Sequence, residues 1–179
     1  MDEFLNRRKK LAAQMQNSSI AIIVGAKEIL RNGDAHYAFR QSSDFYYLTG
    51  FNEPDSIMAL TKDSKGDVNF ILFNRPNNPH EEVWNGKRAG LEGACKDHHA
   101  DAAFDVATIN EEMPRLFADK HIIYYAIGAA KAVDKMIVQW LSAAKSHVAG
   151  KAYSQQPGVL FVPNTFTDLT PILNELRLI

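Results

Sequence analysis

Apolar residues along this chain repeat with two periods, one typical of helices and one typical of strands. Apolar side chains three and four positions apart predict helices over residues 2–16, 88–96, 108–118, 130–145 and 169–177. Short apolar or aromatic runs predict strands over residues 20–24, 45–48, 56–61, 68–73, 81–84 and 122–127. Residues 25–44 are polar and rich in turn residues, which predicts an irregular segment.

The order of these elements predicts the fold class. Residues 56–61 and 68–73 are joined by a short polar connector that contains Gly66, which predicts an antiparallel hairpin. Elsewhere helices and strands alternate. The sequence therefore predicts an α/β fold, a mixed β-sheet with helices on both faces. Because it contains no internal repeat, low-complexity segment or linker, we expect residues 1–179 to form one domain.

Charge and cysteine content narrow the possible environments and partners. The net charge is −1, which argues against a surface built to neutralise nucleic-acid phosphates. The single cysteine, Cys95, allows no intramolecular disulfide, so a reducing cytosol is expected. No apolar run approaches the length of a membrane span, and the N-terminal residues lack the apolar core of a signal peptide. We therefore expect a cytoplasmic protein with neither nucleic-acid nor membrane partners.

Familiar catalytic motifs, such as a nucleophile elbow, a Walker loop or a zinc-binding His-Glu-x-x-His, are absent from the sequence. One dense group of titratable residues contains Cys95, His98 and His99. On a helix, Cys95 would face one of the two histidines, so a metalloenzyme site is one hypothesis. The alternative is a solvated helix end, which we favour because no second ligand cluster completes a four-coordinate shell.

Two further groups of residues admit both a structural and a functional interpretation. Asp34, His36 and Arg40 lie close together in a segment where binding residues concentrate, yet Arg40 could simply pair with Asp34 or Asp44. Trp84 lies in a polar, glycine-containing stretch and is either a core residue or a partly exposed contact. By contrast, the other tryptophan, Trp140, lies on the apolar face of a predicted helix and is expected in the core.

Residues 39–54, which read Phe-Arg-Gln-Ser-Ser-Asp-Phe-Tyr-Tyr-Leu-Thr-Gly-Phe-Asn-Glu-Pro, form a long and specific motif. This block closely resembles the amino-terminal domain of aminopeptidase P, the Xaa-Pro aminopeptidases of the creatinase/prolidase family. The resemblance spans essentially the whole chain and also includes Arg7-Arg8 and residues 73–75, 82–88 and 171–178.

The resemblance implies a two-domain enzyme that removes the first residue from peptides with proline second. Its carboxy-terminal "pita-bread" domain holds two divalent metal ions, usually manganese, through two Asp, one His and two Glu. Because this chain stops at Ile179, where that domain should begin, we expect no metal site and no catalytic residue here. We expect a piece of a longer enzyme; the alternative is a stand-alone binding or scaffold domain without peptidase activity.

The resemblance also implies an accessory role in a homo-oligomer, a dimer or tetramer. In the family's tetramers, the amino-terminal domain of one subunit reaches the active site of a neighbour. There the position matching Trp84 lines the proline-side pocket, and the position matching Asp34 lies near the substrate's free amine. Arg40 keeps its structural interpretation. Related enzymes use an arginine before the last helix; here the nearest basic residue is Lys151, and that contact is not transferred.

Overall fold

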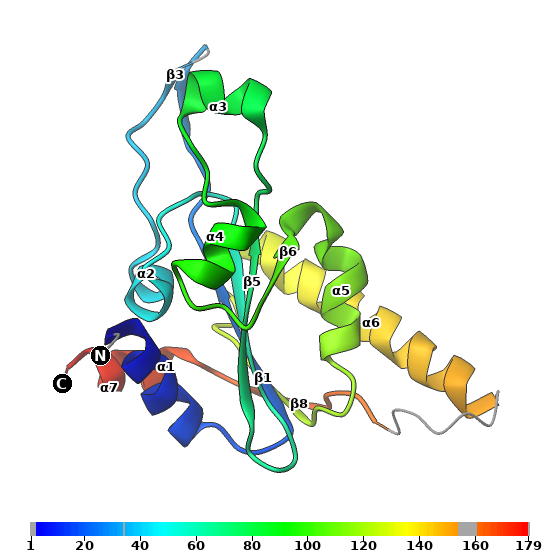
Figure 1. The fold of residues 1–179 in the computed structure, drawn as a ribbon. Helices are drawn as coiled ribbons and strands as arrows, with labels where there is room; N and C mark the ends of the chain where they lie inside the picture. The colour runs from blue at the N-terminus through cyan, green and yellow to red at the C-terminus, as the bar shows by residue number, and fades with distance from the viewer. Residues whose placement is uncertain (1–2, 34, 154–160, 179) are drawn as a thin grey trace.

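The computed structural model describes residues 3–33, 35–153 and 161–178, and a mixed sheet forms its centre (Figure 1). Within the described residues, six strands make up this sheet, in the spatial order β6 (Ala102–Asp105), β5 (Val68–Asn74), β4 (Ile57–Lys62), β1 (Ser19–Val24), β7 (Ile122–Tyr124) and β8 (Thr165–Thr167). Strand β4 is antiparallel to both β1 and β5, and the other neighbouring strands are parallel. The predicted hairpin is therefore confirmed as β4–β5.

Strand β1 lies at the centre of the sheet and is buried on both faces, as its continuous apolar run predicts. Ala21 and Ile23 point into one core, whereas Ile20 and Ile22 point into the other. Two apolar layers thus pack on opposite faces of one strand, and both need covering helices.

Helices cover both faces of the sheet, which confirms the predicted fold class (Figure 1). On one face lie α1 (Glu3–Gln14), α2 (Ser43–Thr49), α4 (Gly90–Lys96) and α7 (Thr170–Arg177). On the other face lie α5 (Ile109–Leu116), which follows a 3₁₀ turn at Val106–Thr108, and α6 (Lys131–Tyr153). Trp140 of α6 is 1% exposed, and its Nε1 donates to Asn110 Oδ1 at 2.8 Å, so its predicted core position is confirmed.

The arginine pair in α1 ties that helix to α2. Arg8 is 3% exposed, donates to the Leu48 carbonyl at 2.9 Å and stacks its guanidinium over the ring of Phe70. Arg7 donates to the Tyr47 carbonyl at 3.1 Å and lies over the Tyr47 ring. Both side chains hydrogen-bond carbonyls in the last turns of α2, which have no partner within that helix. The role of the pair is therefore structural.

The predicted strand over residues 45–48 is wrong, because this segment is part of helix α2. Phe45, Leu48 and Thr49 are buried at helical spacing, and Asp44 lies in the first turn, where a carboxylate is favourable. Gly50 ends the helix in the left-handed conformation, with φ at 64°. Packing of one helical face against the core outweighs the strand preference of the aromatic residues.

The predicted strand over residues 81–84 is also wrong, because these residues lie in helix α3 (Pro79–Asn85). The Asn78 side chain caps the helix by accepting from the backbone N–H groups of His80 and Glu81. Pro79 occupies the first turn, where its missing N–H is not needed.

Other differences concern shorter segments. The irregular segment 25–44 contains a small antiparallel pair, β2 (Leu30–Asn32) and β3 (Ala35–His36). Strands β6 and β8 were not predicted, β7 ends before residue 127, and α6 continues beyond residue 145. The remaining predicted helices and strands are present, with ends that differ by a few residues.

Candidate functional site

Two segments leave the sheet at the same end of its strands and project beyond it. Strand β1 ends at Val24 and β5 ends at Asn74. Because β4 is antiparallel to both, β1 and β5 run in the same direction, and their carboxyl ends lie on the same side of the sheet. We name residues 26–41 the hairpin arm and residues 75–89 the helical arm. Figure 1 shows β3 and α3 together at this end of the molecule. The carboxyl edge of a sheet is where α/β proteins commonly place binding residues.

The helical arm presents large apolar side chains to solvent. Trp84 is 87% exposed and Val83 is 76% exposed. Trp84 is therefore not a core residue, which excludes one of the two interpretations of the sequence. An exposed indole gives an apolar ring a flat surface to pack on, and tryptophan is enriched where proteins bind partners.

The hairpin arm also carries exposed apolar residues, namely Ile29, Leu30 and Tyr37. Asp34, the other candidate for contact with substrate, lies outside the described residues. With Trp84 and Val83, these side chains give both arms exposed apolar surface, whose removal from water is favourable. Such surface is typical of sites that contact another molecule.

Polar contacts stiffen the helical arm. Glu82 Oε1 accepts hydrogen bonds from Asn77 Nδ2 and from the Asn78 backbone N–H, each at 3.1 Å. The bond from the Asn77 side chain lowers the pKa of Glu82, with help from the Asn78 N–H, although desolvation opposes both. Arg88, which follows α3, forms an ion pair with Glu81, so the first turn of the helix is tied to the loops on both sides of it.

Two buried amide side chains hold the bases of the arms. Gln41 is 7% exposed; its Oε1 accepts from the N–H groups of Ala26 and Ser42, at 2.6 and 2.9 Å. Asn74 is fully buried, and its Nδ2 donates to the carbonyls of Gly90 and Arg75, at 2.9 and 3.2 Å. Each amide thus joins the two points where one arm leaves the body. The sequence assigns neither residue a role, although Gln41 lies within residues 39–54 and Asn74 within residues 73–75 of the resemblance.

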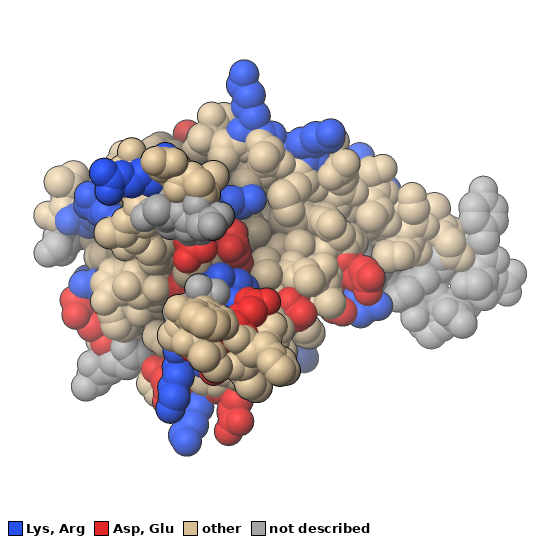
Figure 2. All heavy atoms as spheres, turned by 90° about the horizontal axis from the view of Figure 1, so that it is seen from above, with Lys and Arg blue, Asp and Glu red and all other residues tan. Residues whose placement is uncertain are grey.

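The end of the molecule that carries the arms is shown in Figure 2, where acidic and basic side chains lie together in and around a hollow between projecting parts of the surface. At the same edge lies a mainly apolar pocket of about 540 Å³, beside the base of the hairpin arm. It is lined by Val24, Ile57, Val106, Ile109, Val133 and Met136, with Lys27 and Asp55 as its charged residues.

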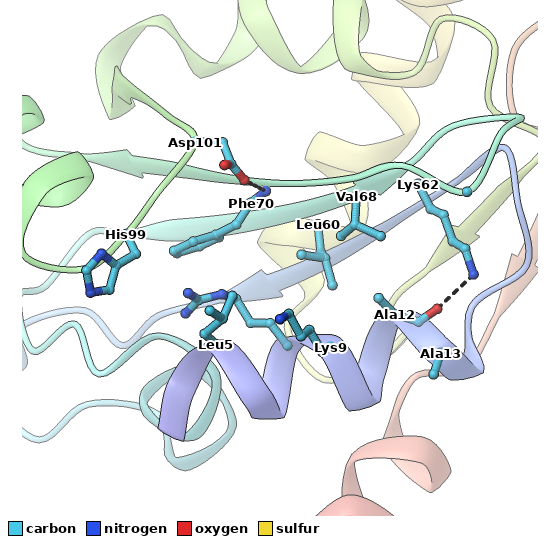
Figure 3. A pocket seen from close by; sticks show the side chains of 12 residues that line it. Leu5, Lys9, Ala12, Ala13, Leu60, Lys62, Val68, Phe70, His99 and Asp101 are labelled. Carbon is cyan, nitrogen blue, oxygen red and sulfur yellow. Dashed lines mark hydrogen bonds between the residues drawn. The ribbon is translucent and has the colours of Figure 1, made fainter. Parts of the chain in front are cut away.

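A second hollow, of about 360 Å³, lies between α1 and the β4–β5 hairpin (Figure 3). Its polar groups serve the fold. Lys62 Nζ donates to the carbonyls of Ala12 and Met15, at 3.0 and 2.9 Å, and so satisfies the end of α1. Asp101 accepts from the Phe70 N–H at 2.7 Å. We therefore assign this hollow no part in the candidate site.

The other residues singled out from the sequence do not assemble into a site in the described chain. Cys95 is exposed, and the His98 ring packs edge-on against Phe51. Among the described residues, no group of three or more His, Cys, Asp or Glu side chains could hold a metal ion. The metal hypothesis for Cys95, His98 and His99 therefore finds no ligand set there.

Arg40 and Lys151 gain no functional role from the structure. Arg40 is exposed, and Asp44, one of its two predicted partners, pairs instead with Arg177 at 2.7 Å. Lys151 belongs to α6, and its side chain lies outside the described part of the chain. None of the helices in the described ranges is long and apolar enough to cross a membrane.

This architecture defines a mixed α/β domain whose candidate contact residues lie on two arms at one sheet edge. A profile of the aminopeptidase P N-terminal domain matches residues 4–124. The chain therefore belongs to the aminopeptidase P N-terminal domain family.

Individual relatives agree with this assignment. The chain is 34% identical over 176 residues to the Xaa-Pro aminopeptidase of Escherichia coli strain K12. The aligned region covers 98% of this chain and 38% of that protein. Proline aminopeptidase P II from Yersinia pestis has the same coverage, with 36% identity and a TM-score of 0.89. A zinc-substituted E. coli aminopeptidase P in complex with product has a TM-score of 0.87 at 33% identity. The chain thus spans less than two fifths of the length of these relatives.

Proposed function

We propose that this chain is the non-catalytic N-terminal domain of a Xaa-Pro aminopeptidase and shapes the substrate pocket of a neighbouring subunit. The observation that carries the proposal is Trp84, an indole 87% exposed on a helix that projects from the sheet edge. An indole this exposed contributes little to the stability of the isolated domain. Against the prolyl ring of a peptide it provides an apolar wall.

Asp34 is the second residue of this proposed pocket. A carboxylate attracts the ammonium group at the start of a peptide. Together, an indole for the proline ring and a carboxylate for the free amine would recognise the two ends of a Xaa-Pro dipeptide unit. The hairpin arm and the helical arm would each contribute one of these groups.

The chemistry itself belongs to the carboxy-terminal domain in this proposal. Peptide hydrolysis by two metal ions needs a carboxylate-rich shell that holds both ions and orients a water molecule. The described residues offer no such group, so they do not fit a pair of divalent ions. We propose that the carboxy-terminal domain holds these two ions and that they are manganese. The domain's partners are then its own catalytic domain and further copies of the full-length chain in a cytoplasmic dimer or tetramer.

The test changes Trp84 to alanine in the full-length enzyme. Loss of the apolar contact with the prolyl ring removes roughly 1–2 kcal/mol, so kcat/KM for Xaa-Pro peptides should fall about 5- to 30-fold. His80→Ala is a matched control, because His80 is another exposed residue of α3 and is not one of its apolar contact residues. Circular dichroism of both variants checks that the domain remains folded.

Two results would refute the role of Trp84. One is a Trp84→Ala enzyme with unchanged kcat/KM. The other is an equal loss in His80→Ala, which would indicate a general effect of altering α3. A measurement of the mass of the assembled enzyme in solution for each variant separates a pocket defect from a loss of assembly, because only the latter lowers that mass.

A further inference from the structure

The two arms are joined through one residue, Glu53, which lies in the loop between α2 and β4. Its backbone carbonyl accepts a hydrogen bond from Gln41 Nε2 at 2.9 Å. Its side-chain Oε1 accepts from the Ala89 N–H at 2.6 Å. Gln41 closes the hairpin arm and Ala89 ends the helical arm, so Glu53 contacts the bases of both.

Close packing on the hairpin side leaves little freedom for this connection. Gly25 donates its N–H to the Ser56 carbonyl at 2.8 Å. A Cβ atom at Gly25 would lie 2.8 Å from that carbonyl oxygen and 3.1 Å from Gln41 Oε1. The Ser56 hydroxyl in turn donates to the Glu53 carbonyl at 3.1 Å. The loop that carries Glu53 is therefore fixed against the end of β1.

On the helical side, the Glu53 carboxylate provides the cross-connection. Asn74 joins the start of the helical arm to Gly90, but its side chain makes no hydrogen bond with a described residue of the hairpin arm. The bond to Ala89 is short and has a charged acceptor, which makes it one of the stronger kinds of hydrogen bond. Without it, the helical arm would retain its internal contacts and lose its link to the loop between the arms.

We infer that Glu53 is a positioning residue that sets the separation between the two arms. Its carbonyl holds the closed base of one arm, and its carboxylate holds the end of the other. The consequence for substrate recognition rests on the proposed function, because the arms carry Asp34 and Trp84. The linkage itself is a property of this chain and is measured without peptide.

The experiment measures the distance between the arms by pulsed electron spin resonance. Asn32→Cys and Val83→Cys place one nitroxide on each arm, and Cys95→Ser removes the chain's single native cysteine. The distance distribution should be narrow with Glu53 in place. In Glu53→Ala it should broaden on the order of twofold, because the helical arm then samples more orientations.

A conservative variant and a remote control make the test specific. Glu53→Gln retains an Oε1 acceptor, and Glu53 Oε2 makes no hydrogen bond with the described residues, so this variant should restore the narrow distribution. Trp140→Phe also removes one side-chain hydrogen bond, but on the opposite face of the sheet from α2, and it should leave the distribution unchanged.

An unbroadened distribution in Glu53→Ala overturns the inference, as does equal broadening in Trp140→Phe. Failure of Glu53→Gln to restore the narrow distribution also overturns it. These outcomes are independent of peptidase kinetics, so they remain distinct from a failure of the role proposed for Trp84.

Discussion

Gln41 offers the sharpest test of how the arms are held. The side chain is 7% exposed and makes four hydrogen bonds, which also reach the carbonyls of Phe51 and Glu53 at 3.3 and 2.9 Å. Gln41→Ala removes all four. At about 0.5–1.5 kcal/mol each, the free energy of unfolding should fall by about 2–6 kcal/mol. That is a large share of the stability of an ordinary domain.

Urea unfolding followed by tryptophan fluorescence suits this measurement. Trp84 is exposed before unfolding, so the emission change reports mainly on Trp140, which is buried on the opposite face from α2. With an m-value of roughly 2 kcal/mol/M, the predicted loss lowers the midpoint by roughly 1–3 M. Gln14→Ala is the control, because Gln14 is exposed on α1 and its loss should matter by less than about 0.5 kcal/mol.

A second variant separates the amide's two functions. Gln41→Glu keeps an oxygen for the N–H groups of Ala26 and Ser42 but presents another oxygen to two carbonyls. It should destabilise the domain at least as much as alanine does, because a buried charge then has one oxygen against two carbonyl oxygens and no donor for it. If both variants unfold within about 1 kcal/mol of the parent chain, the described hydrogen bonds do not hold the hairpin arm.

Two further predictions concern the body of the domain. Gly50→Ala should lower the free energy of unfolding by about 1–3 kcal/mol, because φ at Gly50 is 64° and a Cβ atom there would lie 2.5 Å from the Phe4 ring. A thermal unfolding scan should show a lower melting temperature, and an unchanged one would contradict this geometry. Burial, aided by a hydrogen bond with Asp134, raises the pKa of Tyr125 to about 12, above its ordinary value of 10.0. Its stabilising contribution is therefore complete below pH 10 and is lost as the pH rises towards 12, and Tyr125→Phe should flatten that part of a stability profile.

The sequence predicts the parts of the fold in which each residue's environment repeats along the chain. The run Ile20–Val24 is apolar throughout because both faces of β1 are covered, and the two β4–β5 segments are joined by a connector too short for anything but a hairpin. The apolar pattern does not predict helix α3. Its apolar residues Val83 and Trp84 both face solvent, so no buried face generates a helical period.

The candidate site is harder to predict because its supports connect distant segments. Gln41 and Asn74 are ordinary polar residues in the sequence, and only the fold brings them against the bases of the arms. Strands β6 and β8 depend in the same way on partners elsewhere, since they are short and lie at the two edges of the sheet. The sequence makes Trp84 a candidate, but its exposure is a property of the fold and not of the local sequence.

The strand order also bears on how the chain folds during synthesis. Strands β1, β4 and β5 are consecutive strands of the sheet and pair as an antiparallel meander, whereas β1 must wait for Ile122–Tyr124 before it can pair with β7. Pairings between nearby residues form faster than pairings between remote ones. The meander, which includes both strand ends from which the arms depart, can therefore assemble on the ribosome before the residues that complete the sheet have been translated.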